Sequence, residues 1–204
     1  MKILAIDTAT DESAVALHVD GASAERSVAW RSAFLETAPA ALELLRWSGI
    51  GWRDLDGIAV PAGPGSFTGL RVGAALALGI AELRGLPLFA PSTLAVVAEA
   101  AAPGGAGRVL ATLDARRGRR YAAVLVRKGA AWSVAAGPVD VETDAAEAWA
   151  PGLPHARLET AGREGSPALA LARLVAAAPD SYRLASPSDL RIAYARPATE
   201  PSAR

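Results

Sequence analysis

A glycine-rich turn, GPGSFTGLR at residues 63–71, constrains the fold of this chain more than any other stretch. It stands between a short apolar run at 57–62, typical of a buried strand, and a long alanine-rich stretch that predicts a helix. Glycine permits close approaches that side chains forbid, so another part of the molecule must pass near the turn. Either the turn holds an anion at a helix N-terminus, or it lets a second helix pack closely. Ser66 and Thr68 are candidate N-caps in both cases.

The phosphate-binding alternative lacks the residues that such loops need. A Walker loop requires GxxxxGK followed by Ser or Thr, but Gly69 is followed by Leu70, and the GxGxxG spacing of dinucleotide-binding turns is absent. The packing alternative has small residues at intervals of four, which places them on one face of a helix. Either a partner helix or the chain's own sheet could pack against this face. Its members are Gly65, Gly69, Gly73, Ala77 and Ala81.

The composition and charge balance exclude several classes of protein. Lys and Arg together number 21, as do Asp and Glu, so no net charge attracts the chain to nucleic acid or an anionic membrane. The absence of cysteine excludes disulfides, thiolate nucleophiles and cysteine-based zinc sites, and fits a reducing compartment. Asp7 comes too early for a signal peptide, and the longest apolar run, at 72–81, is too short to cross a bilayer. We therefore expect a soluble, cytoplasmic protein.

The first half of the chain predicts three strands and then an alternation of strands and helices. An apolar run at 2–8 suits a buried strand, and segments at 13–19 and 23–30 flank Asp20-Gly21, a strong hairpin signal. Apolar residues spaced three and four apart predict an amphipathic helix over 32–47. The pattern indicates a layered α/β structure. The remaining predicted elements are a strand at 57–61, a helix over 68–84, a strand at 87–90 and a helix beginning near residue 92.

A flexible segment at 103–107 introduces a second half that repeats the opening pattern. Residues 108–114 resemble residues 2–7, with a basic residue, an apolar run and a terminal Asp. Two domains are therefore predicted, over 1–102 and 103–196, and the polar stretch 197–204 is predicted to be a disordered tail. Within the second domain we expect strands at 120–127 and 131–136 and helices at 144–149 and 167–177.

Few residues form a recognisable catalytic or metal-binding pattern. At the end of the first strand, the Asp7 carboxylate could hold a hydrated metal ion while the hydroxyls of Thr8 and Thr10 meet a phosphate, although such residues also form turns. His18 and His155 are isolated, which disfavours a metal site, and no Ser-His-Asp set is evident. Arginines around an expected hairpin tip could contact RNA phosphates or remain solvated. They are Arg116, Arg117, Arg119 and Arg120.

Segments spread over most of the chain resemble the bacterial TsaB family, also called YeaZ, and occur in the order of that family. GPGSFTGLR is the most specific of them. The resemblance implies an α/β actin-like (ASKHA, ribonuclease H-like) fold of two domains, each with a mixed sheet and helices, and a role in making threonylcarbamoyladenosine in tRNA. The segments are IDTAT at 6–10, LDGIAVPAGPGSFTGLRVG at 55–73, PLFAPSTLA at 87–95, LDARRGRRYAAVL at 113–125 and YAR at 194–196.

The resemblance also implies which partners the chain has. In that family a sibling subunit, TsaD, transfers the threonylcarbamoyl group with a His-x-x-x-His metal site that this chain lacks. The chain would then be a non-catalytic subunit that dimerises with TsaD through N-terminal helices and activates it, joined by the ATPase TsaE, with tRNA bound by the complex. ATP and metal would belong to those partners, and a homodimer could use the same face. The interface predicted from this is Gly65, Gly69, Arg71, Gly73, Ala77 and Ala81.

The chain departs from the family pattern at Ala33-Phe34, where the family commonly has His-Ser, and in a rather short C-terminal region. An actin-like nucleotide site needs phosphate loops from both domains, and LDARRGRR at 113–120 lacks the glycine-rich loop of such a site. Asp7, Thr8 and Thr10 are therefore expected to be the remnant of a nucleotide site. An alternative in which the chain is itself an enzyme, either a weak actin-like ATPase or a peptidase acting on its sibling, stays open.

Overall fold

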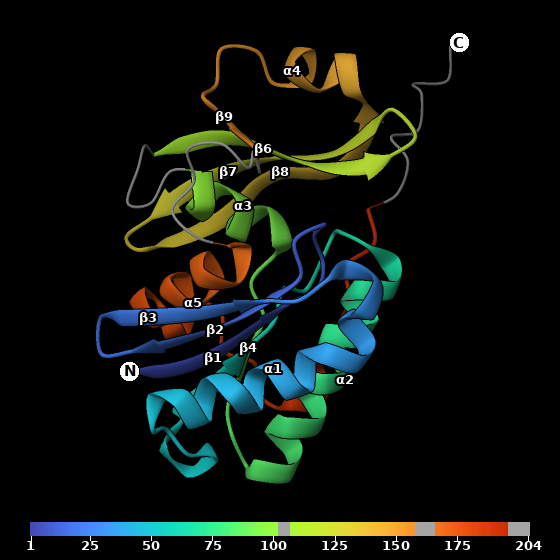
Figure 1. The fold of residues 1–204 in the computed structure, drawn as a ribbon. Coiled ribbons are helices and arrows are strands. Elements are labelled where there is room, and N and C mark those ends of the chain that lie inside the picture. The colour runs from blue at the N-terminus through green and yellow to red at the C-terminus, as the bar shows by residue number, and fades with distance from the viewer. Residues whose placement is uncertain (102–106, 158–165, 196–204) are drawn as a thin grey trace.

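The computed structural model describes residues 1–101, 107–157 and 166–195, and contains two β-sheets with helices between and around them (Figure 1). In the first sheet, three antiparallel strands precede two strands that run parallel to β1, in the order β3-β2-β1-β4-β5. This is the mixed sheet expected from the opening hairpin and the later strand–helix alternation. Its strands are β1 (Lys2–Asp7), β2 (Ala14–Val19), β3 (Ala22–Ser27), β4 (Gly57–Ala59) and β5 (Leu88–Phe89).

Both faces of the first sheet are covered by helices. Successive side chains of a strand point to opposite faces, so Leu4 and Ile6 of β1 join the core under α1 (Ala33–Ser48) and α2 (Phe67–Arg84). Ile3 and Ala5 join the core on the other side, with α3 (Thr93–Ala101) and α5 (Pro167–Ala177). Figure 1 shows α1 and α2 side by side on the outer face of this sheet.

The second sheet has the order β8-β7-β6-β9, with β6, β7 and β8 antiparallel and β9 parallel to β6. Its outer face carries the short helix α4 (Ala146–Trp149), which buries Leu110 and Ala122. The strands are β6 (Arg108–Arg116), β7 (Arg119–Lys128), β8 (Ala131–Glu142) and β9 (His155–Arg157), and short 3-10 helices occur at Trp30–Ser32, Trp52–Asp54, Thr143–Ala145, Pro179–Ser181 and Pro187–Asp189.

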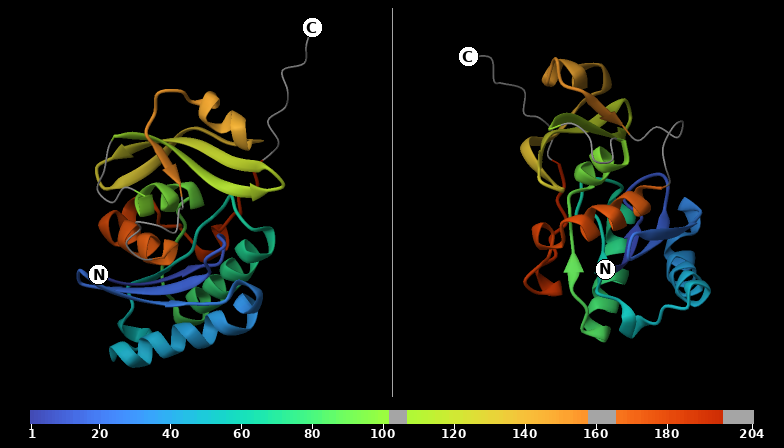
Figure 2. Two further views of the ribbon diagram at one scale, coloured as in Figure 1. Left: turned by 45° about the horizontal axis from the view of Figure 1, so that its top comes forward. Right: turned by 90° about the vertical axis from the view of Figure 1, so that its left-hand side faces the viewer.

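The two sheets share one apolar core. Helices α3 and α5 lie between them in both views of Figure 2. Ile3 of the first sheet, Val109 of the second and Leu171 of α5 belong to the same buried cluster. Burial of this continuous apolar area stabilises the arrangement of the sheets, and therefore the position of the cleft described below.

The chain returns to the first sheet after β9. Helix α5 packs on β1 and β2, the amide of Leu184 donates to the Leu88 carbonyl at 3.0 Å, and the amide of Ala193 donates to the Ala62 carbonyl at 2.7 Å. Residues 166–195 thus lie mainly against the first sheet, whereas the sequence predicts that they belong to a second domain over 103–196. The boundary between 1–102 and 103–196 stays a prediction, and the tail at 197–204 lies outside the described residues.

The expected strands over 57–61 and 87–90 are shorter in the structure, β9 was not expected, and two strands differ most from their expected bounds. The strand expected over 23–30 ends at Ser27 and gives way to a 3-10 turn, whereas the strand expected over 131–136 continues to Glu142. The longer strand contains Pro138, which an edge strand such as β8 tolerates because it pairs on one side only. Among the described residues, no helix combines the length and apolar character that crossing a membrane requires.

Candidate functional site: a cleft between the two sheets

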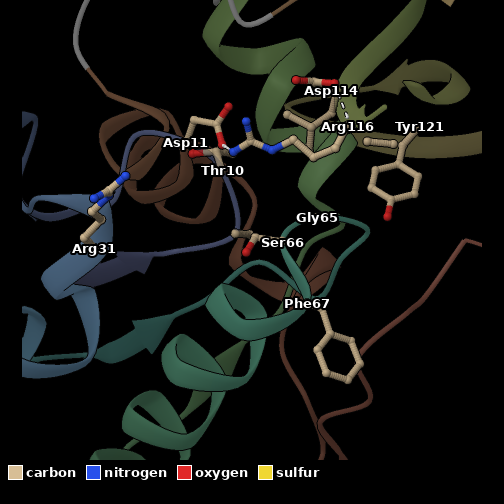
Figure 3. Close-up of a pocket in the computed structure, with 12 residues that line it drawn as sticks. Thr10, Asp11, Arg31, Gly65, Ser66, Phe67, Asp114, Arg116 and Tyr121 are labelled. Carbon is tan, nitrogen blue, oxygen red and sulfur yellow. Dashed lines mark hydrogen bonds and ion pairs between the residues drawn. The ribbon is translucent and has the colours of Figure 1, made fainter. Parts of the chain in front are cut away.

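A cavity of about 640 Å³ opens between the two halves of the chain (Figure 3). The loop after β1 and the start of α2 form one side, and the β6–β7 hairpin forms the other. The lining combines apolar side chains with carboxylates, guanidinium groups and hydroxyls from both halves. They belong to Ala9, Thr10, Asp11, Arg31, Gly65, Ser66, Phe67, Leu113, Asp114, Ala115, Arg116 and Tyr121.

The glycine turn brings the start of α2 against the loop that follows β1. A Cβ on Gly69 would overlap the carbonyl oxygen of Thr8, and one on Gly65 would lie 2.6 Å from the carbonyl oxygen of Ala9. The Thr8 hydroxyl donates to the Gly69 carbonyl at 2.6 Å, and the Ser66 hydroxyl accepts from the Gly69 amide at 3.2 Å. Ser66, rather than Thr68, is therefore the N-cap, and the close approach is between two segments of the same chain.

The small-residue face of α2 continues this internal packing. A Cβ on Gly73 would lie 2.6 Å from the Thr8 hydroxyl, and Ala77 and Ala81 are fully buried in the core under the first sheet. A partner helix cannot reach these positions without displacing the sheet. Packing within the chain, on the loop after β1 and on the first sheet, therefore accounts for Gly69, Gly73, Ala77 and Ala81, and any interface on α2 must use its exposed side.

Arg71 belongs to that exposed side but already has neighbours. Its guanidinium lies 3.7 Å from the centroid of the Phe67 ring, and its Nε donates to the hydroxyl of Tyr194 at 3.3 Å. Tyr194 comes from the last described segment of the chain, more than a hundred residues away. The sequence analysis identified Arg71 and the YAR segment at 194–196 separately. Their positions in the sequence did not indicate that Arg71 and Tyr194 are in contact.

Of the three residues predicted as a nucleotide-site remnant, Thr10 lines the cavity and Asp7 and Thr8 do not. Asp7 is fully buried: its Oδ1 accepts from the Ala9 amide at 2.7 Å, whereas its Oδ2 has no partner. Burial raises the pKa of this carboxyl to about 7, against the lowering effect of the backbone hydrogen bonds. Together with the use of Thr8 in helix packing, this geometry does not fit a carboxylate and hydroxyl presented to a metal-bound nucleotide. The described residues contain no cluster of three or more potential metal ligands.

Three of the four hairpin arginines contact other parts of the chain. Arg116 forms an ion pair with Asp11 across the cleft, and Arg119 donates from Nε to Asp140 at 2.7 Å. Arg120 donates from Nε to the Thr112 hydroxyl at 3.3 Å. In the described parts of the chain, Arg117 has no such partner, and its φ of 54° places it in the left-handed region, which is unfavourable for an arginine. The proposal of RNA contact is therefore best supported for Arg117.

The structure brings together one set that sequence reasoning missed. The hydroxyl of Thr112 lies 2.9 Å from Nε2 of His155, and Nδ1 of His155 lies 3.1 Å from Glu147. This order of hydroxyl, imidazole and carboxylate resembles an activated nucleophile. The sequence predicted an isolated His155, but in the structure its ring has polar neighbours on both nitrogens. Burial, together with the charge of Arg157, lowers the pKa of His155. However, Thr112 is fully buried, so no substrate can reach its oxygen in this structure.

Two α/β halves that share a core and face each other across a cleft define a protein of the actin-like class. A family model described as TsaD, tRNA N6-adenosine threonylcarbamoyltransferase, matches residues 28–179. The chain belongs to this family. Its similarity to TsaB (YeaZ) proteins confirms the resemblance predicted from the sequence motifs.

The similarity to individual proteins supports this placement. The chain is 42% identical over 123 residues to the tRNA threonylcarbamoyladenosine biosynthesis protein TsaB of Escherichia coli (strain K12). The aligned region covers 59% of this chain and 53% of that protein. It is 38% identical over 130 residues to the TsaB protein of Haemophilus influenzae (strain ATCC 51907), which covers 63% of this chain and 55% of that protein. The chain thus spans about half the length of these curated relatives. The solved structure of YeaZ from Pseudomonas aeruginosa superposes with a TM-score of 0.73 at 25% identity, covering 95% of this chain and 99% of that one.

Proposed function

We propose that the chain is a non-catalytic subunit of the machinery that makes threonylcarbamoyladenosine in tRNA, and that it docks on a TsaD-like catalytic subunit and activates it. A TsaE-like ATPase and tRNA would join through that complex, and the cytoplasm would be its location. The observation that carries the proposal is a pair of outer helices with exposed apolar side chains and no cover within the described chain. The names of the relatives supply the pathway.

Both outer helices carry exposed apolar side chains. Phe34 and Leu35 of α1 are 78% and 71% exposed, and Leu83 of α2 is 78% exposed. On α2, the exposed side also carries Ala75 and Gly79, and a Cβ on Gly79 would meet nothing within 4 Å. Exposed large apolar side chains are typical of protein–protein contact sites, and small residues on a helix allow another helix to approach closely. We therefore move the proposed interface from the buried small-residue face to α1 and to the later turns of α2, from Ala75 to Leu83, which leaves the first turns of α2 outside it.

The chemistry of the described residues also supports a partner role. The one hydroxyl–imidazole–carboxylate set that we identify has a buried hydroxyl, and the buried Asp7 does not line the cleft. A group that performs chemistry must reach its substrate, either directly or through one water molecule. Transfer of the threonylcarbamoyl group would therefore take place on the partner subunit.

The docking face can be tested with Leu35→Asp. The side chain is exposed, so the folded chain tolerates the change, but a carboxylate buried unpaired in an interface weakens binding. We expect the affinity for a TsaD-like subunit to fall about a hundredfold, or ~3 kcal/mol, when measured by calorimetry. Size-exclusion chromatography with light scattering should show loss of the heterodimer. The same measurement on the chain alone reports whether a homodimer uses this face.

The matched control is Trp47→Asp. Trp47 lies on the same helix and is as exposed as Phe34, but it lines a groove beside Ala24 and Arg26 of β3. We expect this variant to bind the TsaD-like subunit normally. Unchanged affinity in Leu35→Asp would exclude this face as the interface. Gly73→Leu cannot serve as a test, because its side chain would collide with Thr8 inside the chain.

The alternative of a weak actin-like ATPase is tested separately. Thr10 and Ser66 place hydroxyls in the cleft, and Arg31 and Arg116 place cations there, so an anionic ligand has groups to meet. Calorimetric titration of the chain with ATP and magnesium should show no tight binding. Tight binding that disappears in Asp7→Ala would establish a nucleotide site instead. The peptidase alternative requires that the chain cleaves a TsaD-like subunit and that Thr112→Val abolishes this cleavage.

A further inference from the structure

We propose that Phe67, Arg71 and Tyr194 form a stacking platform for an unpaired RNA base at the rim of the cleft. This inference rests on the proposed function in tRNA modification. It assigns to this chain, rather than only to its partners, a contact with a single-stranded part of the RNA.

The platform is assembled from two distant segments. Phe67 and Arg71 come from the first turns of α2, and Tyr194 comes from the last described segment. The rings of Phe67 and Tyr194 lie 5.5 Å apart, and Arg71 both stacks on Phe67 and donates to the Tyr194 hydroxyl. The backbone hydrogen bond from Ala193 to Ala62 fixes the segment that carries Tyr194. The rings are therefore held in place before any ligand arrives, which lowers the entropy lost on binding.

Both rings are open to solvent. Phe67 is 56% exposed and Tyr194 is 49% exposed. Two aromatic rings and a guanidinium plane are the groups on which unpaired bases stack in single-stranded nucleic acid complexes. A stack of this kind tolerates any base, because every base presents a π face.

The surroundings favour a nucleic acid over an apolar protein segment. Phe67 also lines the cleft, which carries charged side chains, and its ring points away from the pair formed by Asp11 and Arg116 (Figure 3). Arg31 lines the same cleft and, with Arg117 at the hairpin tip, has no ion-pair or hydrogen-bond partner among the described residues. Both arginines are therefore available to phosphates of a bound strand.

Stacking must carry most of the affinity, because the chain as a whole has no net charge. Each phosphate contact to a single strand contributes a slope of about −0.7 to the dependence of log affinity on log salt. Contacts from Arg31 and Arg117 alone therefore predict a shallow slope of about −1.4. Binding through a broad basic surface would give a much steeper slope.

The test measures binding of the full chain, alone and with a TsaD-like subunit, to a fluorescent RNA hairpin with an unpaired loop. Phe67→Leu keeps an apolar side chain but removes the stacking ring, and should weaken binding about tenfold, as expected for one stacked base. Tyr194→Phe keeps the ring and should bind normally, whereas Tyr194→Leu should resemble Phe67→Leu. A blunt RNA duplex, which offers no unpaired base, should show no difference between wild type and variants.

The docking variant separates this inference from the proposed function. Leu35→Asp should abolish the partner complex and leave the RNA affinity of the chain alone unchanged. Equal affinity of Phe67→Leu and wild type for the hairpin, with and without the partner, would overturn the platform. So would loss of partner binding in Phe67→Leu without loss of RNA binding, since the patch would then be a protein contact.

Discussion

At the scale of single residues, Asp7 and Thr8 at the end of β1 have structural roles. Thr8 uses its hydroxyl to hold the first turn of α2, and Asp7 is buried with one oxygen unpartnered. A buried polar atom without a hydrogen bond destabilises the folded state by about 1–3 kcal/mol. Protonation of Asp7 relieves the larger penalty of a buried charge, which is why its pKa rises.

This shift makes stability depend on pH. The pKa of Asp7 is about 7 in the folded chain and 3.8 in the reference state. Between these values the folded chain holds a proton that the unfolded chain has released, so Asp7 lowers the free energy of unfolding by up to about 1.4 kcal/mol for each pH unit gained. The loss is complete about one pH unit above the folded pKa.

Asp7→Asn should remove this dependence, because asparagine stays neutral and still accepts from the Ala9 amide. Urea unfolding of both proteins from pH 5 to pH 8 should give curves that diverge, with the wild type losing stability relative to the variant as pH rises. Parallel curves would mean that Asp7 is ionised in the folded chain throughout this range.

At the scale of elements, α2 has two faces that look alike in sequence. Gly69 and Gly73 face the loop after β1, and Gly79 faces solvent. The same small side chain thus permits close packing inside the chain at one position and leaves an open surface at another. Periodicity places residues on faces of a helix, but it does not say which face meets the sheet.

The two faces should respond oppositely to the same substitution. Gly69→Ala places a methyl group against the Thr8 carbonyl, and overpacking of this kind destabilises by about 3 kcal/mol. Gly79→Ala meets nothing and should stabilise the helix by about 1 kcal/mol, because alanine loses less backbone entropy. Thermal unfolding by circular dichroism measures both. Equal effects would mean that α2 can move away from β1.

At the scale of the whole molecule, the two sheets are linked by buried contacts of several kinds. In addition to the shared apolar core, Glu99 of α3 accepts from Arg127 of β7 and from Trp132 of β8, both at 2.9 Å. Tyr182 accepts from the Trp132 amide at 2.7 Å and lies beside β5, where Ala90 donates to its carbonyl. The last part of the chain therefore joins both sheets.

We expect the two sheets to unfold together. Native-state hydrogen exchange should give β1 and β6 amides the same opening free energy, equal to that of global unfolding, because strands that share a core open as one unit. Raising urea should lower both values in parallel. If β6 amides exchanged at a much lower free energy, the second sheet would be an independent folding unit, as the predicted division at 102/103 implies.

The sequence by itself determined the class of fold, the order of most elements and the family. Local signals suffice for these: Asp20-Gly21 forms the turn between β2 and β3, and GPGSFTGLR begins α2. The tertiary structure alone decided where the small residues of the glycine turn pack, how α5 returns to the first sheet, and which hairpin arginines have partners within the described residues. It also brought Tyr194 to Arg71 and His155 to Thr112. Such contacts depend on the register and layering of distant segments, which local spacing does not encode.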